Sequence, residues 1–300
     1  MKVLIFGSIN RDYVFSVDHI VSPGETINCF DSSDYWGGKG FNQAVAVAQG
    51  GADTSFACRI QSLDEREITE ILKNYGISSD YIRVGDTPTG HAIIQIDDGG
   101  QNSIIVCPGA NRTVTNEFVE QTLADFSKGD VLLLQNEINN LPYIMQKAAE
   151  QGMHIVFNPS PFEKHLLKLP LDLVDTFVLN EIECNEFTGE ADHDKMQNQM
   201  LKMFPQAKLV LTLGKHGVIY RDSNFSLTHG IYDVPVVDTT AAGDTFTGFF
   251  VANYYNTYDP KESLRLASIA SSLAVSRKGA LPSIPNIREV LSTDLKEIFL

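Results

Sequence analysis

The run Val3-Leu4-Ile5-Phe6, which ends at Gly7, shows the pattern that the rest of the chain repeats. A continuous apolar run with no alternating polar residues is typical of a strand buried on both faces of a parallel sheet. Four later runs have the same design and also end at a polar residue: 131–134, 155–157, 177–179 and 209–211. We therefore expect a sheet of parallel strands.

The segments between these runs are long enough for helices that cross from one strand to the next, with 141–150 and 193–204 as two examples. Alternating strands and helices predict an α/β fold in which helices flank a doubly wound, mostly parallel sheet. Ligands of such folds bind beyond the carboxyl ends of the strands. The polar residues expected there are Asn10, Glu137, Asn158, Asn180 and Thr212.

A second pattern predicts a small accessory sheet. The segments 90–97 and 101–106 flank Asp98-Gly99-Gly100, which indicates a β-hairpin because tight hairpin turns need glycine. The segments 13–17 and 25–30 lack a helical period and are predicted to be short strands. We expect one domain spanning residues 1–300, with a lid formed by about 13–36 and 88–108.

Composition excludes several classes of protein. A net charge of −15 disfavours nucleic acid and anionic membranes as partners, because both are bound by clustered Lys and Arg. The first apolar run is too short for a signal peptide, and none approaches the roughly 18 residues of a membrane span. The four cysteines are far apart, which favours reduced thiols in a cytoplasmic protein over a zinc site or disulfides.

The strongest chemical signal is Asp238-Thr239-Thr240-Ala241-Ala242-Gly243-Asp244-Thr245-Phe246. A helix is predicted to begin near Ala242, because 245–255 is rich in apolar residues at helical spacing. Its free N–H groups at Ala242 and Gly243 would form an anion hole for a phosphoryl group. Asp244 in the first turn could accept a proton from an attacking hydroxyl. An isolated Gly-Asp pair would more often only complement the helix dipole.

A second glycine-rich stretch reads Gly37-Gly38-Lys39-Gly40-Phe41-Asn42-Gln43-Ala44. It lacks the spacer and the Ser or Thr of a phosphate-binding P-loop, and Gln43 stands where a dinucleotide fingerprint has its third glycine. Such a stretch alone more often forms a tight turn before a helix. It also allows the backbone to approach a ligand closely.

Together, these motifs resemble the ribokinase family of sugar kinases over nearly the whole chain. Each motif is modest alone, but their common order is specific. Besides the two stretches above, the resemblance rests on Gly7-Ser8-Ile9-Asn10, Asp12, Pro23-Gly24-Glu25-Thr26, Gly100-Gln101-Asn102-Ser103, Asn158-Pro159, Asn180, Glu183, Thr212-Leu213-Gly214, Gly217 and 277–285. The Thr-Thr-Ala-Ala-Gly-Asp form is more similar to the ribose-phosphorylating branch than to fructokinases or adenosine kinases.

The resemblance implies transfer of the γ-phosphate of ATP to the 5-hydroxymethyl group of a small sugar, expected to be D-ribose. Asp244 would be the catalytic base, with the anion hole at Ala242 and Gly243. Hydrogen bonds to the sugar are implied for Asn10, Asp12, Gly38, Lys39, Asn42, Glu137 and Asp244. ATP would contact Asn180, Thr212, Gly214, Gly217, Gly243 and Ser268.

Two metals and one partner are also implied by the resemblance. Glu183 would hold Mg²⁺ through water, together with ATP. Activating K⁺ would bind at Asp238, Thr240, Ala274, Arg277, Gly279 and Ser283, in several cases through carbonyl oxygens. A second copy of the chain would pack against the lid as a homodimer. Two of the residues keep plainer interpretations, Arg277 as a solvated surface charge and Asn158 as a turn former before Pro159.

Two departures from the family leave alternatives open. Arg59-Ile60-Gln61-Ser62-Leu63-Asp64-Glu65 replaces a glycine-containing stretch, and Phe41 replaces a small residue before Asn42. The Phe41 ring could fill the core beneath the lid, or it could narrow the sugar pocket and change specificity. Deoxyribose, fructose or a nucleoside are alternative substrates. A non-catalytic sensor is disfavoured by Asp244, and a nicotinamide oxidoreductase by the incomplete glycine fingerprint.

Overall fold

The computed structural model describes residues 1–299, which form a nine-stranded sheet and a separate four-stranded sheet. The large sheet has the order β13-β12-β11-β10-β9-β8-β1-β4-β5, and only β12 runs antiparallel to its neighbours β11 and β13. Its strands are β1 (Lys2–Phe6), β4 (Asp53–Gln61), β5 (Ile82–Gly85), β8 (Val131–Gln135), β9 (His154–Asn158), β10 (Thr176–Asn180), β11 (Lys208–Thr212), β12 (Val218–Arg221) and β13 (Ser226–His229). All five strands predicted from apolar runs are confirmed.

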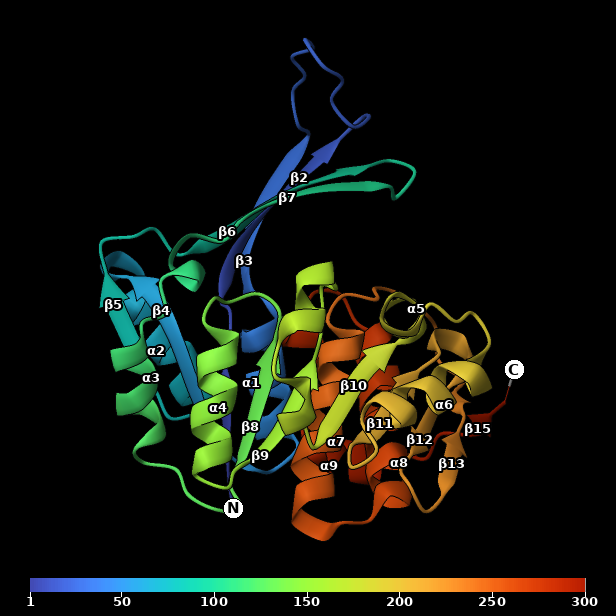
Figure 1. Cartoon of the computed structure of the whole chain (residues 1–300). Helices are drawn as coiled ribbons and strands as arrows, with labels where there is room; N and C mark the ends of the chain where they lie inside the picture. Colours follow the sequence, from blue (N-terminus) through green and yellow to red (C-terminus); the bar gives the residue numbers. More distant parts are fainter. Residues whose placement is uncertain (300) are drawn as a thin grey trace.

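Helices cover both faces of this sheet (Figure 1). One hydrophobic core includes residues of α1 (Lys39–Gln49), α2 (Glu65–Asn74), α7 (Ala242–Thr257), α8 (Pro260–Val275) and α9 (Ile287–Ser292). The other includes α3 (Asn116–Leu123), α4 (Leu141–Glu150), α5 (Glu181–Thr188) and α6 (His193–Met203). In β1, Val3 belongs to the first core and Leu4 to the second. The strand is therefore apolar at every position, since both faces are buried.

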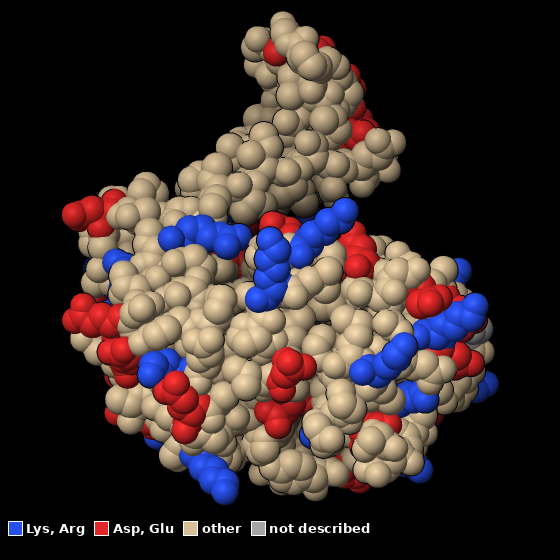
Figure 2. Space-filling model, in the orientation of Figure 1, with Lys and Arg blue, Asp and Glu red and all other residues tan. Residues whose placement is uncertain are grey.

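The four-stranded sheet projects beyond the carboxyl ends of the central strands, such as β8 and β10 (Figure 1). It has the order β3-β2-β6-β7, and we call it the lid: β2 (Asn10–Val17), β3 (Asp31–Gly37), β6 (Gly90–Asp97) and β7 (Asn102–Cys107). The predicted hairpin is confirmed, with Gly100 at φ 77° in its turn. In Figure 2 the visible surface of the lid is mostly uncharged.

The predicted strand at 25–30 is wrong, because β3 begins only at Asp31. Glu25 instead folds back on Ser22, whose carbonyl accepts the Glu25 N–H and whose own N–H donates to the Glu25 carboxylate. Because of these local hydrogen bonds, the segment begins with a turn and does not pair as the expected strand. A pair of two-residue strands, β14 (Ile231–Tyr232) and β15 (Glu297–Ile298), was not anticipated either.

Both departures from the family pattern are accommodated without distortion of the core. The glycine-free stretch continues as strand β4 to Gln61, makes one 3₁₀ turn at Ser62–Asp64, and enters α2 at Glu65. Phe41 is fully buried, and its ring centroid lies 5.6 Å from that of Phe56 on β4. The core placement of Phe41 is therefore confirmed.

Two expectations from composition concern membrane spans and cysteines. Within residues 1–299, the chain contains no helix with the length and hydropathy of a membrane span. Cys29, Cys58, Cys107 and Cys184 are all free thiols.

Candidate active site

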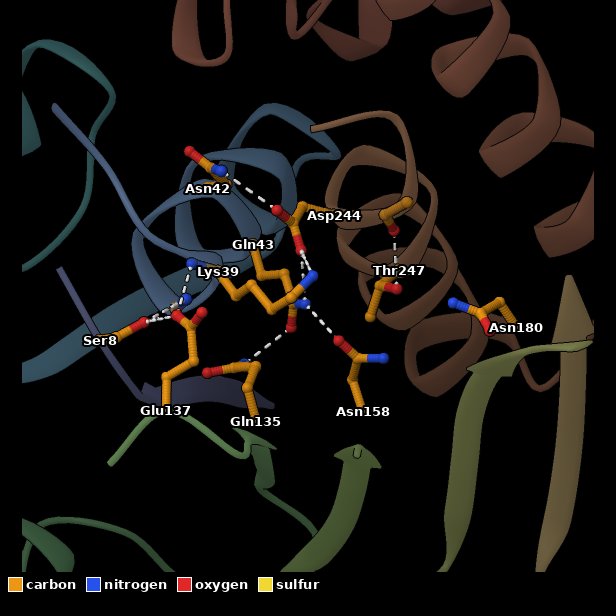
Figure 3. A network of polar contacts seen from close by, with 12 residues as sticks. Ser8, Lys39, Asn42, Gln43, Gln135, Glu137, Asn158, Asn180, Asp244 and Thr247 are labelled. Atoms are coloured by element: carbon orange, nitrogen blue, oxygen red, sulfur yellow. Dashed lines mark hydrogen bonds and ion pairs between the residues drawn. The ribbon is translucent and has the colours of Figure 1, made fainter. Parts of the chain in front are cut away.

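Two helix N-termini, those of α1 and α7, meet at the carboxyl ends of the central strands beneath the lid (Figures 1 and 3). The chain enters α1 from lid strand β3 through Gly38, which has φ 93°. A Cβ at Gly38 would lie 3.0 Å from the Asn10 nitrogen, so glycine is required by both conformation and space. The chain enters α7 through Ala241, which has a left-handed φ of 58°.

Asp244 lies in the first turn of α7 with its side chain buried (Figure 3). Its Oδ1 accepts a hydrogen bond of 2.9 Å from Gln43 Nε2, and its Oδ2 accepts one of 3.1 Å from Asn42 Nδ2. Lys39 Nζ lies 4.0 Å from Oδ1. The carboxylate thus faces α1, with an amide on each oxygen and an ammonium group nearby.

Glu137 organises the opposite side of this space. Its carboxylate accepts a 3.0 Å hydrogen bond from the Lys39 N–H and another from the Ser8 hydroxyl. Ser8 Oγ also accepts from the Gly40 N–H, so it joins Glu137 to the start of α1. Burial, reinforced by the charge of Glu137, raises the pKa of Asp12 to about 6. The role of Ser8 was not predicted, although it lies in a quoted motif.

Two asparagines that the sequence predicted to bind the sugar also lie in this region. Asn10 is buried, and its Oδ1 accepts a 2.8 Å hydrogen bond from Asn111 Nδ2. Because Asn10 Oδ1 faces Asn111, the Asn10 NH₂ group points away from it. No sequence signal had singled out Asn111. Asn42 has a buried Oδ1 that accepts no hydrogen bond from residues 1–299. A buried acceptor without a donor is suited to a ligand hydroxyl.

Lys39 lies between the residues predicted to bind the sugar and those predicted to bind ATP. The charge of Asp244, followed by those of Glu137 and Glu183, raises the pKa of Lys39, so the ammonium form is favoured. A small cavity of about 70 Å³ lies beside it. Its lining includes Lys39, Asn158, Asn180, Glu183, Thr212, Gly243 and Asp244.

A larger cavity of about 250 Å³ adjoins the first. Its lining contains all six residues expected to contact ATP: Asn180, Thr212, Gly214, Gly217, Gly243 and Ser268. Val218, Ile231 and Phe246 add apolar walls that sequence reasoning missed, since they come from three separate elements. Gly217 has φ 89°, and a Cβ there would lie 2.2 Å from the His229 carbonyl oxygen.

Glu183 and Asn180 form a capping box at the start of α5. The Asn180 side chain accepts from the Glu183 N–H at 2.9 Å, and the Glu183 carboxylate accepts from the Asn180 N–H at 3.0 Å. Both side chains are therefore held in place by the helix end they cap. They line the small cavity together with Asp244.

The N-terminus of α7 has the features of an anion site. No side chain in the described range caps this helix, and Ala242 and Gly243 line the larger cavity. A Cβ added at Gly243 would meet no protein atom within 4 Å, so its backbone faces open space. The Ala242 N–H donates a long hydrogen bond of 3.3 Å to the Thr239 carbonyl. N–H groups that stay free at a helix start attract anions.

The residues expected around a monovalent cation lie where two loops meet. The carbonyl of Val275 accepts from the N–H groups of Val237 and Asp238 at 2.8 and 3.1 Å. Partial burial disfavours the charged form of Asp238, but hydrogen bonds from Thr240 and Gly279 outweigh it and lower its pKa. Ser283 is buried nearby, with its carbonyl 3.5 Å from an Arg277 guanidinium nitrogen.

Arg277 is more than a solvated surface charge, because its guanidinium pairs with Glu289. Asn158 also does more than form a turn, because its amide donates to the Val178 carbonyl and accepts from Gln43. In residues 1–299, no three His, Cys, Asp or Glu side chains gather as a metal cluster. Carboxylate and carbonyl oxygens such as those of Asp238 and Ser283 are the ligands a hard cation accepts, and here they accept hydrogen bonds from Thr240, Gly279 and Arg277.

Comparison with known proteins matches residues 1–287 to the family model for pfkB family carbohydrate kinases. The chain is 36% identical over 301 residues to ribokinase of Staphylococcus aureus, covering 96% of this chain and 98% of that protein. The crystal structure of ribokinase from Thermotoga maritima superposes with a TM-score of 0.85 at 32% identity, covering 97% and 98% of the two chains. Arabidopsis thaliana ribokinase complexed with ribose and ATP gives a TM-score of 0.83 at 30% identity, covering 97% of both chains.

Proposed function

The chain belongs to the pfkB family of carbohydrate kinases, and we propose that it transfers the γ-phosphate of ATP to the 5-hydroxymethyl group of D-ribose. The relatives named ribokinase support the choice of sugar, and the structure with ribose and ATP supports the choice of phosphate donor. The observation that carries the proposal is the junction of the two cavities. They share Asn180, Thr212 and Gly243, so a phosphate chain in the larger cavity can reach Asp244 in the smaller one.

The sugar would lie between α1, the lid root and Glu137. Asp12 and Glu137 offer acceptors for its hydroxyls, and the amides of Asn10 and Asn42 offer both donors and acceptors. The Gly38 backbone permits close approach because it has no Cβ. This arrangement would leave the 5-hydroxyl facing Asp244.

Transfer then needs one proton acceptor and one anion site. As the 5-oxygen forms its bond to the γ-phosphorus, its proton passes to the Asp244 carboxylate. The bond from phosphorus to the β-bridging oxygen breaks, and its electron pair leaves with ADP. The N–H groups of Ala242 and Gly243, with Lys39, would stabilise the charge on the transferring phosphoryl group.

Two cations would support these groups. Mg²⁺ bound with ATP supplies positive charge to the phosphates, and Glu183 would hold it through water beside Asn180. Asp238, Gly279 and Ser283, with carbonyls of Thr240, Ala274 and Arg277, would hold K⁺. Its position next to the loop that leads into α7 would keep the anion hole in its binding geometry.

The lid supports a homodimer. Ile93 and Ile105 are paired directly across the hairpin and both are exposed. By the alternation of strands, Gln95 and Cys107 share their face, whereas Asp12 lies on the opposite face toward the sugar. Ile104 and Val106, on the same face as Asp12, are exposed as well. Exposed apolar side chains on a small sheet are commonly covered by a partner. We propose that two copies pack through the face of Ile93 and Ile105, in the cytoplasm where ATP is available.

The test is an ADP-release assay with ATP, Mg²⁺ and a panel of D-ribose, 2-deoxyribose, fructose and adenosine. D-ribose is expected to give the highest kcat/KM, and phosphorus NMR should identify a 5-phosphate product. A higher kcat/KM for adenosine or fructose would overturn the choice of sugar. Sugar binding without ADP release from any member of the panel would favour the sensor.

A further inference from the structure

Gln43 lies at the centre of a buried chain of amides that ends on Asp244 (Figure 3). Its side chain is fully buried on α1. Nε2 donates to Asp244 Oδ1 at 2.9 Å and to Asn158 Oδ1 at 2.9 Å, while Oε1 accepts from Gln135 Nε2 at 2.7 Å. Both amide protons and the carbonyl oxygen of Gln43 are therefore engaged by protein.

The orientation of this amide is determined by its neighbours. Asn158 Nδ2 donates to the Val178 carbonyl at 2.8 Å, which leaves Asn158 Oδ1 to accept from Gln43. Gln135 donates to Gln43 Oε1 from the other side. A flipped Gln43 amide would place its oxygen against both the Asp244 carboxylate and the Asn158 oxygen. The chain therefore directs the Gln43 NH₂ group at Asp244.

Close packing of two helices holds the donor and the acceptor at this distance. One turn along from Gln43 on α1 and from Asp244 on α7, Ala46 lies against Gly248. A Cβ at Gly248 would lie only 2.3 Å from the Ala46 Cβ, so the helices approach as near as a glycine allows. Groups on rigidly packed helices keep a more exact geometry than groups on loops.

The adjacent amide, Asn42, is bonded differently. It donates to Asp244 Oδ2 at 3.1 Å, but its own buried Oδ1 accepts no hydrogen bond from residues 1–299. Asn42 therefore retains an acceptor for a ligand hydroxyl, whereas both polar atoms of the Gln43 amide already have protein partners. The two neighbours in the glycine-rich stretch thus serve different partners.

We propose that Gln43 is the positioning residue of the catalytic base. It anchors Oδ1 of Asp244 and leaves Oδ2, on the side of Asn42, as the oxygen that accepts the sugar proton. A neutral amide can orient the carboxylate without neutralising its charge. This inference rests on the proposed function, in which Asp244 is the base.

The experiment compares Gln43→Leu and the similarly shaped, uncharged Gln43→Met with the matched control Gln197→Leu. Gln197 is a buried glutamine on α6 that donates to the His193 carbonyl at 3.0 Å, remote from Asp244 in the fold. Both Gln43 variants should lower kcat by about 10–100-fold, the usual cost of losing an orienting partner. The dissociation constants for ribose and ATP should change by less than about threefold. The control should lower Tm but leave kcat unchanged.

A double-mutant cycle separates positioning from general disruption. In an Asp244→Asn background, Gln43→Leu should cost no further activity, because the group it orients is already lost. An equal loss in both backgrounds, or wild-type kcat in both Gln43 variants, would overturn the inference. If Gln43→Leu does not fold, the kcat of Gln43→Met decides alone. Wild-type activity of Asp244→Asn itself would instead refute the proposed function.

Discussion

The N–H of Gly279 donates a 2.9 Å hydrogen bond to Oδ2 of Asp238, 41 residues earlier in the chain. Oδ1 of the same carboxylate accepts from the Thr240 N–H at 2.9 Å and from the Thr240 hydroxyl at 2.6 Å. The loop after α8 and the loop before α7 are therefore joined through one side chain. The loop before α7 leads directly into Ala242 and Gly243, the proposed anion site.

We predict activation by potassium, because a cation at this junction would hold the loop that precedes the anion hole. Rates in sodium, caesium and potassium at constant ionic strength should be highest in potassium. Asp238→Asn should reduce the potassium response while leaving ribose affinity unchanged. Equal rates with all three cations would contradict this prediction.

Asp244→Asn should lower kcat by about 10²–10⁴-fold, the usual cost of removing a general base. The amide keeps the shape of the side chain, so ribose and ATP should still bind, as measured by calorimetry. Phosphoryl transfer near the wild-type rate would show that the base lies elsewhere.

Phe41→Ala should destabilise the protein by about 3–5 kcal/mol, the usual cost of removing a buried phenyl ring. Because the ring packs on Phe56 in the core, the ratios of kcat/KM across the sugar panel should stay unchanged. Denaturant unfolding and the ADP-release assay measure the two effects. Changed substrate ratios at unchanged stability would mean that the ring contacts the sugar.

Ile105→Asp should convert the proposed homodimer into a monomer, because a charge in an apolar interface lacks a partner. Light scattering measures the mass directly. Leu63→Asp is a matched control, since Leu63 is 83% exposed and lies outside the lid. A wild-type protein that is monomeric at assay concentrations would refute the lid interface.

The raised pKa of Asp12 predicts a pH dependence of stability. Its pKa is about 6 in the folded chain against 3.8 for the ordinary group, because of burial and the charge of Glu137. Between these values the folded state binds the proton more tightly, so this group makes the protein less stable as pH rises from about 4 to about 6.

Asp12→Asn removes that titration. The free energy of unfolding of the variant minus that of wild type should therefore be about 1–3 kcal/mol larger at pH 7 than at pH 3.5. Urea unfolding of both proteins at the two pH values measures the change. A difference between them that is independent of pH would exclude Asp12 as the titrating group.

Local patterns were sufficient for the framework. Continuous apolar runs such as 131–134 predicted the central strands, since a strand buried on both faces must be apolar at every position. The start of α7 near Ala242 followed from the change of spacing after Gly243. Strands β4, β5, β12 and β13 were missed because polar residues interrupt their apolar pattern.

By itself, the sequence determined which residues end the strands and begin the helices of the site, from Asn180 and Thr212 to Asp244. The tertiary structure alone decided which of them meet. Gln43 and Asp244 are 201 residues apart, and only the close packing of α1 on α7 brings them to 2.9 Å. The placement of Phe41 was decided in the same way, because burial depends on neighbours such as Phe56 that no local pattern identifies.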